Sequence, residues 1–289
     1  MVGKKKETGN RLLSAAVYGF VVADALGVPY EFRKRGTFRC TDMVGYGTHN
    51  QPPGTWSDDS SMLLATCRSL KENDFRINIE DLRSRFLGWL NDGEFTPDGK
   101  VFDVGYATSQ ALFSGKAQTD EFSNGNGSLM RILPLAFIDC SDDGIKTVSG
   151  ITHGHRISKE ACVIYVHTIR EFLKQDHDEQ KSLAQIIREL PEMAKPFDRL
   201  HILSDLSEDE IKSTGYVVDT LEAAFWCILQ ADRNKEGYKE CVLRAVNLGD
   251  DTDTVAAVTG GLAGLIYDLP EGWISKLRNR DLIQDCLWI

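Results

Sequence analysis

The segment "TVAAVTGGLAGLIY", residues 254–267, combines the apolar character of a buried helix with three glycines. A glycine inside a helix costs about 1 kcal/mol relative to alanine, so several of them favour a helix whose backbone is approached closely by a neighbour. The segment "SAAVYGFVVADALG", residues 14–27, has the same small-residue character. We therefore predict that these two segments form the central helix pair of the core.

Apolar side chains recur at helical spacing in further segments, including 82–90, 162–173 and 218–228. Clusters of Gly, Pro, Asp and Asn separate these segments, and no internal repeat or low-complexity linker divides the chain. The longest non-helical stretch, 38–54, is predicted to hold a short strand or a functional loop. The sequence thus predicts an all-α fold with a single compact multi-helix domain over residues 1–289, in which residues 1–10 form a flexible tail.

The charge balance limits the choice of partners. Lys plus Arg number 33 against 43 Asp plus Glu, a formal net charge of −10, so nucleic acid is not an expected partner. Lys4–Lys6 followed by an apolar run resembles a signal peptide, but Asp24 interrupts that run. We predict a buried first helix and no membrane span.

The seven cysteines are widely spaced and include no Cys-x-x-Cys pair. This pattern is typical neither of a disulfide framework nor of a zinc site. Free cysteines fit a reducing compartment, so a cytoplasmic location is expected.

Two acidic clusters have the same arrangement: "TWSDDSSM", residues 55–62, and "GDDTDTVAA", residues 249–257. Each can be read as a helix N-terminus, with Ser57 as the N-cap of one helix and the second cluster capping the other. A cap needs one oxygen acceptor, whereas Asp250, Asp251 and Asp253 lie within four residues. Crowded carboxylates repel unless cations offset their charge, and such oxygens suit Mg²⁺, Mn²⁺ or Ca²⁺. Glu31 is a further candidate contributor.

The stretch "NGNGSLMR", residues 124–131, predicts a loop of a different kind. Asn and Gly accept left-handed backbone angles, and a helix beginning near Ser128 would present N–H groups to a phosphate. A tight turn capped by Ser128 is the alternative. In "THGH" (152–155), His153 and His155 lack partners at metal-ligand spacing, and His49 has no pattern that supports a role.

These stretches, together with "ADALGVPYEF" (23–32) and "VFDVG" (101–105), resemble the ADP-ribosylglycohydrolase family, which includes the dinitrogenase-reductase-activating glycohydrolases. The resemblance runs from about residue 12 to about residue 268. It implies an all-α fold, two Mg²⁺ or Mn²⁺ ions as cofactors, and cleavage of the bond between ADP-ribose and a protein side chain or small acceptor.

The resemblance also implies roles for individual residues. Asp103 matches the position of an acid found in arginine-specific relatives, and Asp250 would be an outer neighbour of the ions. The implied metal ligands are Ser57, Asp58, Asp59, Asp251, Asp253 and Thr254. The implied catalytic residues are Glu31, Asp59 and Asp103. The implied substrate-binding residues are Asn124, Gly125, Asn126, Gly127, Ser128, Met130 and His153.

Several functions remain open at this point. The favoured one is removal of ADP-ribose from arginine side chains, acting as a monomer on an ADP-ribosylated protein or small conjugate. The same chemistry on ADP-ribosyl-serine or O-acetyl-ADP-ribose is an alternative. A non-catalytic ADP-ribose-binding or immunity protein is another, and a structural, crystallin-like role is a third.

Overall fold

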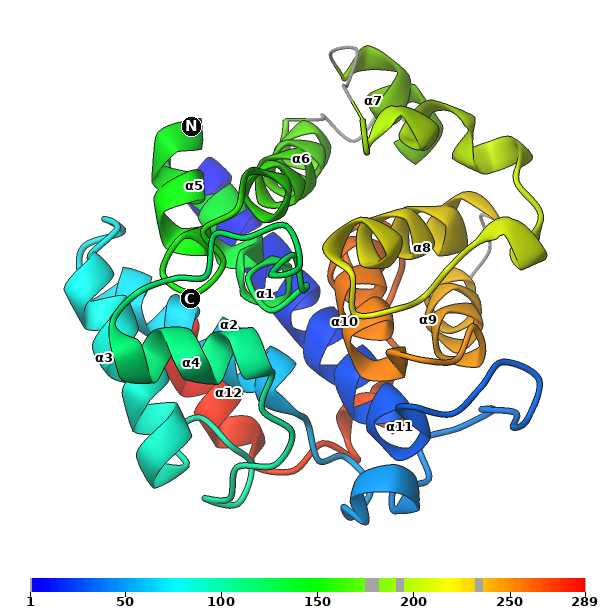
Figure 1. Ribbon diagram of the computed structural model, residues 1–289, viewed down its shortest axis with the longest axis horizontal. Coiled ribbons are helices and arrows are strands. Elements are labelled where there is room, and N and C mark those ends of the chain that lie inside the picture. The colour runs from blue at the N-terminus through cyan, green and yellow to red at the C-terminus, as the bar shows by residue number, and fades with distance from the viewer. Residues whose placement is uncertain (1, 175–181, 191–194, 232–235, 289) are drawn as a thin grey trace.

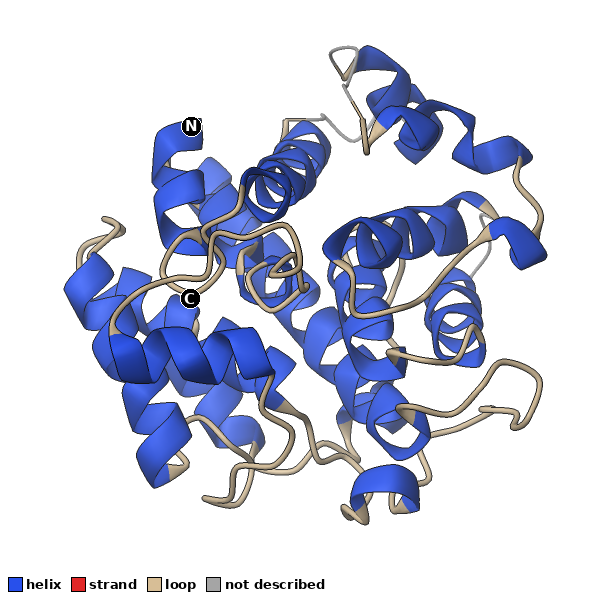
Figure 2. Cartoon of the chain, in the orientation of Figure 1, coloured by secondary structure: helices blue, strands red, loops and turns tan. Residues whose placement is uncertain are grey.

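The computed structural model describes residues 2–174, 182–190, 195–231 and 236–288, and over these residues it is a bundle of helices (Figure 1). The α-helices are α1 (Val2–Gly27), α2 (Asp58–Glu72), α3 (Ile79–Asp92), α4 (Tyr106–Ser114), α5 (Asp142–Ser149), α6 (Arg156–Leu173), α7 (Leu183–Glu189), α8 (Val217–Leu229), α9 (Gly237–Asn247), α10 (Thr252–Ala263), α11 (Glu271–Ile274) and α12 (Arg280–Cys286). Short 3₁₀ helices connect them: η1 (Val28–Tyr30), η2 (Gly47–His49), η3 (Leu129–Arg131), η4 (Leu133–Phe137), η5 (Asp198–Asp205) and η6 (Glu208–Glu210). The described residues contain isolated β-bridges but no strand (Figure 2).

The predicted central pair is confirmed. Helices α1 and α10 share more contacts than any other two described elements. A Cβ added at Gly260 would collide with the Gly19 carbonyl oxygen, and one at Gly264 would collide with the Ala15 carbonyl oxygen. The glycines therefore allow the two backbones to touch, which offsets their cost in helix propensity.

The other helices lie on either side of this pair. Helices α8 and α9 pack against α10. On the opposite side of α1, helices α3 and α12 pack against α2 (Figure 1). The first turns of α2 and α10 both lie near the C-terminal end of α1. Ser57 N–H donates to Asp24 of α1 at 3.0 Å, and Thr252 Oγ1 donates to the Gly27 carbonyl at 2.8 Å. This convergence of helix ends brings the two acidic clusters together.

Two predicted boundaries need correction. Helix α1 begins at Val2, so nearly all of the predicted tail at residues 1–10 is helical; its Lys and Glu residues are good helix formers. Helix α10 ends at Ala263 rather than at residue 267, because the chain closes into a turn in which Leu265 N–H bonds to the Leu262 carbonyl. By length and composition Gly9–Tyr30 is apolar enough to cross a membrane, yet 83% of its most apolar window is buried in the fold.

The stretch 38–54 contains no strand; it is a loop with one isolated bridge, between Tyr46 and Gln51, around η2. Its start is tied to α9, where Asn247 exchanges hydrogen bonds of 2.8 and 3.0 Å with the Cys40 backbone. Its end is tied to the C-terminal region by Arg278 N–H, which donates to the Gly54 carbonyl at 3.1 Å. Between these two ends, η2 packs against η1, where Gly47 lies against the Pro29 backbone.

Candidate metal centre

The first acidic cluster lies in the first turn of α2. Ser57 is the N-cap, as predicted, and its Oγ accepts the Asp59 N–H at 3.2 Å. Asp59 is fully buried and Asp58 is 8% exposed. Two carboxylates at a helix N-terminus are favoured by the helix dipole, but the dipole alone does not explain why both are buried.

The second cluster is formed differently. Gly249 and Asp250 have φ values of 81° and 58°, a left-handed turn that leads into α10. Asp251 occupies the N-cap position but makes no side-chain capping bond, whereas Asp253 Oδ1 accepts the Thr254 N–H at 2.9 Å in the first turn of α10. Instead, Asp251 Oδ2 accepts a hydrogen bond from Asn126 Nδ2 at 2.8 Å. Asp250 is exposed, and its backbone N–H and carbonyl bond to Arg33 and Phe32.

The two clusters meet, although about two hundred residues separate them in the sequence. Carboxylate oxygens of Asp24, Asp59 and Asp253 lie within 4.8 Å of one another. Oxygens of Glu31, Asp251 and Asp253 form a second group with the same limit. Asp253 belongs to both groups, so the carboxylates form one continuous centre.

The donors in this centre suit hard divalent cations. Asp59 Oδ1, Asp251 Oδ1 and Asp253 Oδ2 are buried and have no hydrogen-bond partner. Burial raises the pKa of Asp59 and Asp253 well above the ordinary value, and neighbouring carboxylates add to this effect. Buried oxygens without hydrogen-bond donors are rare because they destabilise the folded state. Two or more divalent cations could coordinate these oxygens and offset their charge. The residues therefore fit the Mg²⁺ or Mn²⁺ pair that the family resemblance implies.

The remaining implied ligands lie beside these groups. Burial raises the pKa of Asp59 and of Asp251, and the neighbouring Thr254 side chain partly opposes both shifts. Burial also raises the pKa of Asp58, and the negative charges of Asp103 and Glu31 add to this effect. Ser57 Oγ donates to Asp59 Oδ2 at 3.3 Å. All six implied ligands are thus gathered in one place.

A third group contains Glu31, His49 and Asp103, whose ligand atoms also lie within 4.8 Å of one another. His49 Nε2 pairs with Glu31 Oε2. Burial raises the pKa of Glu31 to about 7, although the His49 hydrogen bond opposes the shift. The same hydrogen bond raises the pKa of His49. Sequence reasoning missed His49, because nothing in its local pattern indicates that the 38–54 loop reaches Glu31.

Asp24 is a second residue that sequence reasoning missed. It is fully buried in α1 and accepts the Ser57 and Ser60 backbone N–H groups at 3.0 Å, as well as the Ser60 hydroxyl at 2.5 Å. Burial raises its pKa to about 6. The available signal was a lone acid within an apolar helix, because such an acid must have buried partners.

The "NGNG" loop lies against the centre, but not in the predicted form. None of residues 124–127 has a positive φ, and only the three-residue η3 follows Ser128. The N–H groups of Asn126 and Met130 already bond to the carbonyls of Gly215 and Asn126. These two amides therefore cannot serve as the predicted phosphate donors. Ser128 and Met130 are buried, and the Ser128 hydroxyl accepts the Ser149 hydroxyl at 2.9 Å.

The glycines of this loop provide space rather than unusual backbone angles. A Cβ at Gly127 would contact the His153 ring, and one at Gly125 would contact His153 Nε2. His153 is buried, which lowers its pKa to about 3, so it is neutral beneath the loop. Arg131 donates to the Gly127 carbonyl, and to Thr152 Oγ1 at 2.8 Å, which in turn bonds to His153 Nδ1. The "NGNG" and "THGH" motifs thus form one packed unit.

Segment 213–217 connects this unit to Asp251. Asn126 N–H donates to the Gly215 carbonyl, and Asp251 N–H donates to the Ser213 carbonyl, both at 3.0 Å. Val217 N–H bonds to the Asn124 carbonyl at 2.9 Å. The sequence carried no signal for this connection, because each bond joins residues far apart in the chain.

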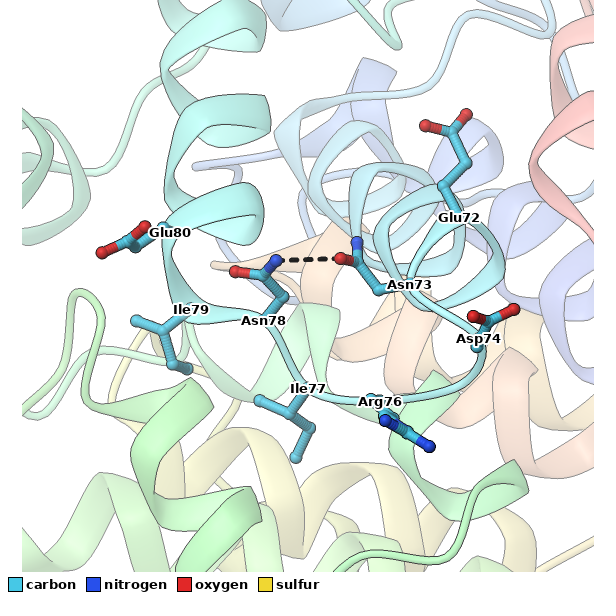
Figure 3. Close-up of a pocket in the computed structure, with 8 residues that line it drawn as sticks. All are labelled: Glu72, Asn73, Asp74, Arg76, Ile77, Asn78, Ile79 and Glu80. Carbon is cyan, nitrogen blue, oxygen red and sulfur yellow. Dashed lines mark hydrogen bonds between the residues drawn. The ribbon is translucent and has the colours of Figure 1, made fainter.

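A separate surface pocket lies at the turn between α2 and α3 (Figure 3). Its lining runs from Glu72 to Glu80 and includes the Asn78–Asn73 hydrogen bond of 2.8 Å. None of its residues belongs to the acidic groups. This pocket is therefore separate from the carboxylate centre.

Fold and site together define an all-α protein with a buried carboxylate centre whose donors suit divalent cations. The model of the ADP-ribosylglycohydrolase family matches residues 7–288. The chain belongs to the ADP-ribosylglycohydrolase family.

Named relatives agree with this assignment. The chain is 30% identical to "ADP-ribosylarginine hydrolase Tri1" of Serratia proteamaculans (strain 568), over 93% of this chain and 76% of that protein. It is 27% identical to "ADP-ribosyl-[dinitrogen reductase] glycohydrolase" of Rhodospirillum rubrum, over 91% of this chain and 88% of that protein. A solved "ADP-ribosylglycohydrolase-related protein complex" superposes with a TM-score of 0.76 at 30% identity and covers 97% of both chains.

Proposed function

We propose that this protein is a metal-dependent hydrolase that removes ADP-ribose from modified arginine side chains. The observation that supports it most directly is the buried centre, in which Asp59, Asp251 and Asp253 each leave an oxygen without a partner. The choice of arginine is supported by relatives named for ADP-ribosylarginine and by the acid at Asp103. We also propose a cytoplasmic location, because all seven cysteines are free.

The proposed ion ligands are Ser57, Asp58, Asp59, Asp251, Asp253 and Thr254. When bound, two Mg²⁺ or Mn²⁺ ions would act as Lewis acids toward ribose oxygens and water. The side chains fix these positions in advance: Asn126 orients Asp251 through its 2.8 Å hydrogen bond. Partners of this kind that orient ligands raise metal affinity substantially.

Glu31 and Asp103 carry the proton chemistry in this proposal. In hydrolysis, the bond between ribose C1″ and the guanidino nitrogen breaks, water supplies the oxygen for C1″, and a proton reaches the departing nitrogen. Glu31 lies between the Asp251–Asp253 group and Asp103, so it is placed to take the proton from water. Asp103 is placed to hydrogen-bond the departing guanidino group, since carboxylates pair well with guanidinium.

The test is an assay of the purified protein on a protein carrying ADP-ribosyl-arginine, with Mg²⁺ or Mn²⁺ and with chelator. We expect release of free ADP-ribose with metal and none with chelator. Release from ADP-ribosyl-serine or O-acetyl-ADP-ribose but not from arginine would change the acceptor. Binding of ADP-ribose without release from any acceptor would replace the enzyme by a binding protein.

A further inference from the structure

The 38–54 loop makes two hydrogen bonds to Glu31, one through Thr48 and one through His49. Thr48 Oγ1 donates to the Glu31 backbone carbonyl at 2.7 Å, and His49 Nε2 pairs with the Glu31 carboxylate. The loop can come this close because residue 47 is glycine: a Cβ there would collide with the Pro29 carbonyl. The side chains of His49 and Glu31 are only 14% and 6% exposed. This contact is therefore enclosed, unlike a surface ion pair.

The His49 ring is itself held in place from two sides. Its centroid lies 5.9 Å from that of Phe32 and 5.2 Å from that of Phe102, both tilted. Phe102 precedes Asp103, whose carboxylate lies within 4.8 Å of the Glu31 and His49 ligand atoms. His49 thus connects three segments: the residues directly after η1, the 38–54 loop and the stretch before α4.

The Glu31 carboxylate needs a hydrogen-bond partner to stay in this position. Its carboxylate lies near the like charges of Asp103 and Asp251, which repel it. A glutamate side chain also has several rotatable bonds, and fixing them costs entropy. Among the described residues, His49 is the side chain that hydrogen-bonds to this carboxylate. Without that donor, repulsion would favour rotation of Glu31 away from the centre.

We propose that His49 is a positioning residue that holds the Glu31 carboxylate between the metal centre and the leaving group. The inference rests on the proposed function, in which Glu31 takes the proton from water. His49 acts through Glu31 and does not itself touch substrate. The 38–54 loop is, by this proposal, part of the active site.

Two substitutions separate the hydrogen bond from the packing. His49→Phe keeps a ring between Phe32 and Phe102 but loses the donor. His49→Gln keeps an N–H donor at the position of Nε2 but loses the ring. The matched control is His167→Phe, since His167 makes a similar pair with Asp142 at 2.7 Å between α6 and α5, outside the acidic groups.

The readouts are kcat and KM for ADP-ribose release from ADP-ribosylated arginine with Mn²⁺. We expect His49→Phe to lower kcat by about 10–100-fold, the range seen when a residue that orients a functional ligand is lost, with KM changed by less than about twofold. His49→Gln should restore most of the lost kcat, and His167→Phe should match the wild type. A wild-type kcat in His49→Phe overturns the proposal, and so does a His49→Gln variant as slow as His49→Phe.

Crystal structures of the wild type and His49→Phe separate this inference from the proposed function. A wild type that releases no ADP-ribose under either metal refutes the function. The position of Glu31 then decides the inference: a displaced carboxylate in His49→Phe supports it, and an unmoved one overturns it.

Discussion

Asp24 caps helix α2 from a different helix. Its Oδ2 accepts both the backbone N–H of Ser60, at 3.0 Å, and the Ser60 hydroxyl, at 2.5 Å. Ser57 N–H donates to the same carboxylate at 3.0 Å. A helix N-terminus has four N–H groups without partners inside the helix, and Asp24 satisfies two at the turn that carries Asp58 and Asp59. The core helix thereby fixes the orientation of the first acidic cluster.

Replacing Asp24 by asparagine should weaken both the fold and metal binding. An amide keeps one acceptor oxygen and places an NH₂ group against the N–H donors, which leaves buried donors unpaired at about 1–3 kcal/mol each. We expect a lower Tm and weaker Mn²⁺ binding by calorimetry. An Asp24→Asn variant with wild-type Mn²⁺ affinity and Tm would contradict the capping role.

Asp253→Asn should nearly abolish metal binding, because Asp253 belongs to both carboxylate groups. We expect no Mn²⁺ binding by calorimetry at concentrations that saturate the wild type, and ADP-ribose release lower by at least about a thousandfold, a typical loss for an essential catalytic group. Asp250→Asn is the matched control: it also removes a carboxylate from the cluster, but an exposed one. Equal effects of the two substitutions would contradict the assignment.

Gly260→Ala should destabilise the fold without removing any polar group. The added Cβ would meet the Gly19 carbonyl and the Ala23 side chain, and overpacking of this kind costs about 1–3 kcal/mol. Gly9→Ala in α1 is the control, since nothing lies within 4 Å of its added Cβ; it should stabilise by up to about 1 kcal/mol. Chemical denaturation measures both. A Gly260→Ala variant as stable as the wild type would exclude close contact of the two backbones.

The stability of the metal-free protein should fall as pH rises from 5 to 8. Burial raises the folded-state pKa of Asp24 to about 6 and that of Glu31 to about 7, above their ordinary values. Groups with raised pKa stabilise the fold at low pH, and this stability is lost as pH rises through the folded pKa. Because cations bind the deprotonated carboxylates, Mg²⁺ or Mn²⁺ should raise Tm more at pH 8 than at pH 5.5. Thermal scans with chelator and with metal measure this difference. An equal rise in Tm at both pH values would contradict the prediction.

The sequence predicted much of the fold because its strongest signals are local. Glycine and alanine at helical spacing identified α1 and α10 as partners, and Ser57 was correctly assigned as an N-cap. The meeting of Asp59 with Asp253 was a prediction from donor chemistry and family resemblance. The structure places their oxygens in one group with Asp24.

The parts that were missed depend on contacts between distant segments. His49 reaches Glu31 only because its loop is tied at both ends to later parts of the chain, through Asn247 and Arg278. The hydrogen bond between Asn126 and Asp251 was not predicted, because the two residues lie far apart in the sequence. The "NGNG" glycines were assigned to backbone freedom, whereas the His153 ring below them is the reason for their size. Periodicity carries none of this information.

The contact between Gly19 and Gly260 has a consequence during protein synthesis. A ribosome adds about 5–20 residues per second, so α1 is synthesised roughly ten seconds or more before α10. During that interval the apolar side chains of α1 that pack against α10 are accessible to chaperones or to other chains. The carboxylate centre is complete only after residues 251–254 have been synthesised, so a chain that terminates before them lacks both Asp251 and Asp253.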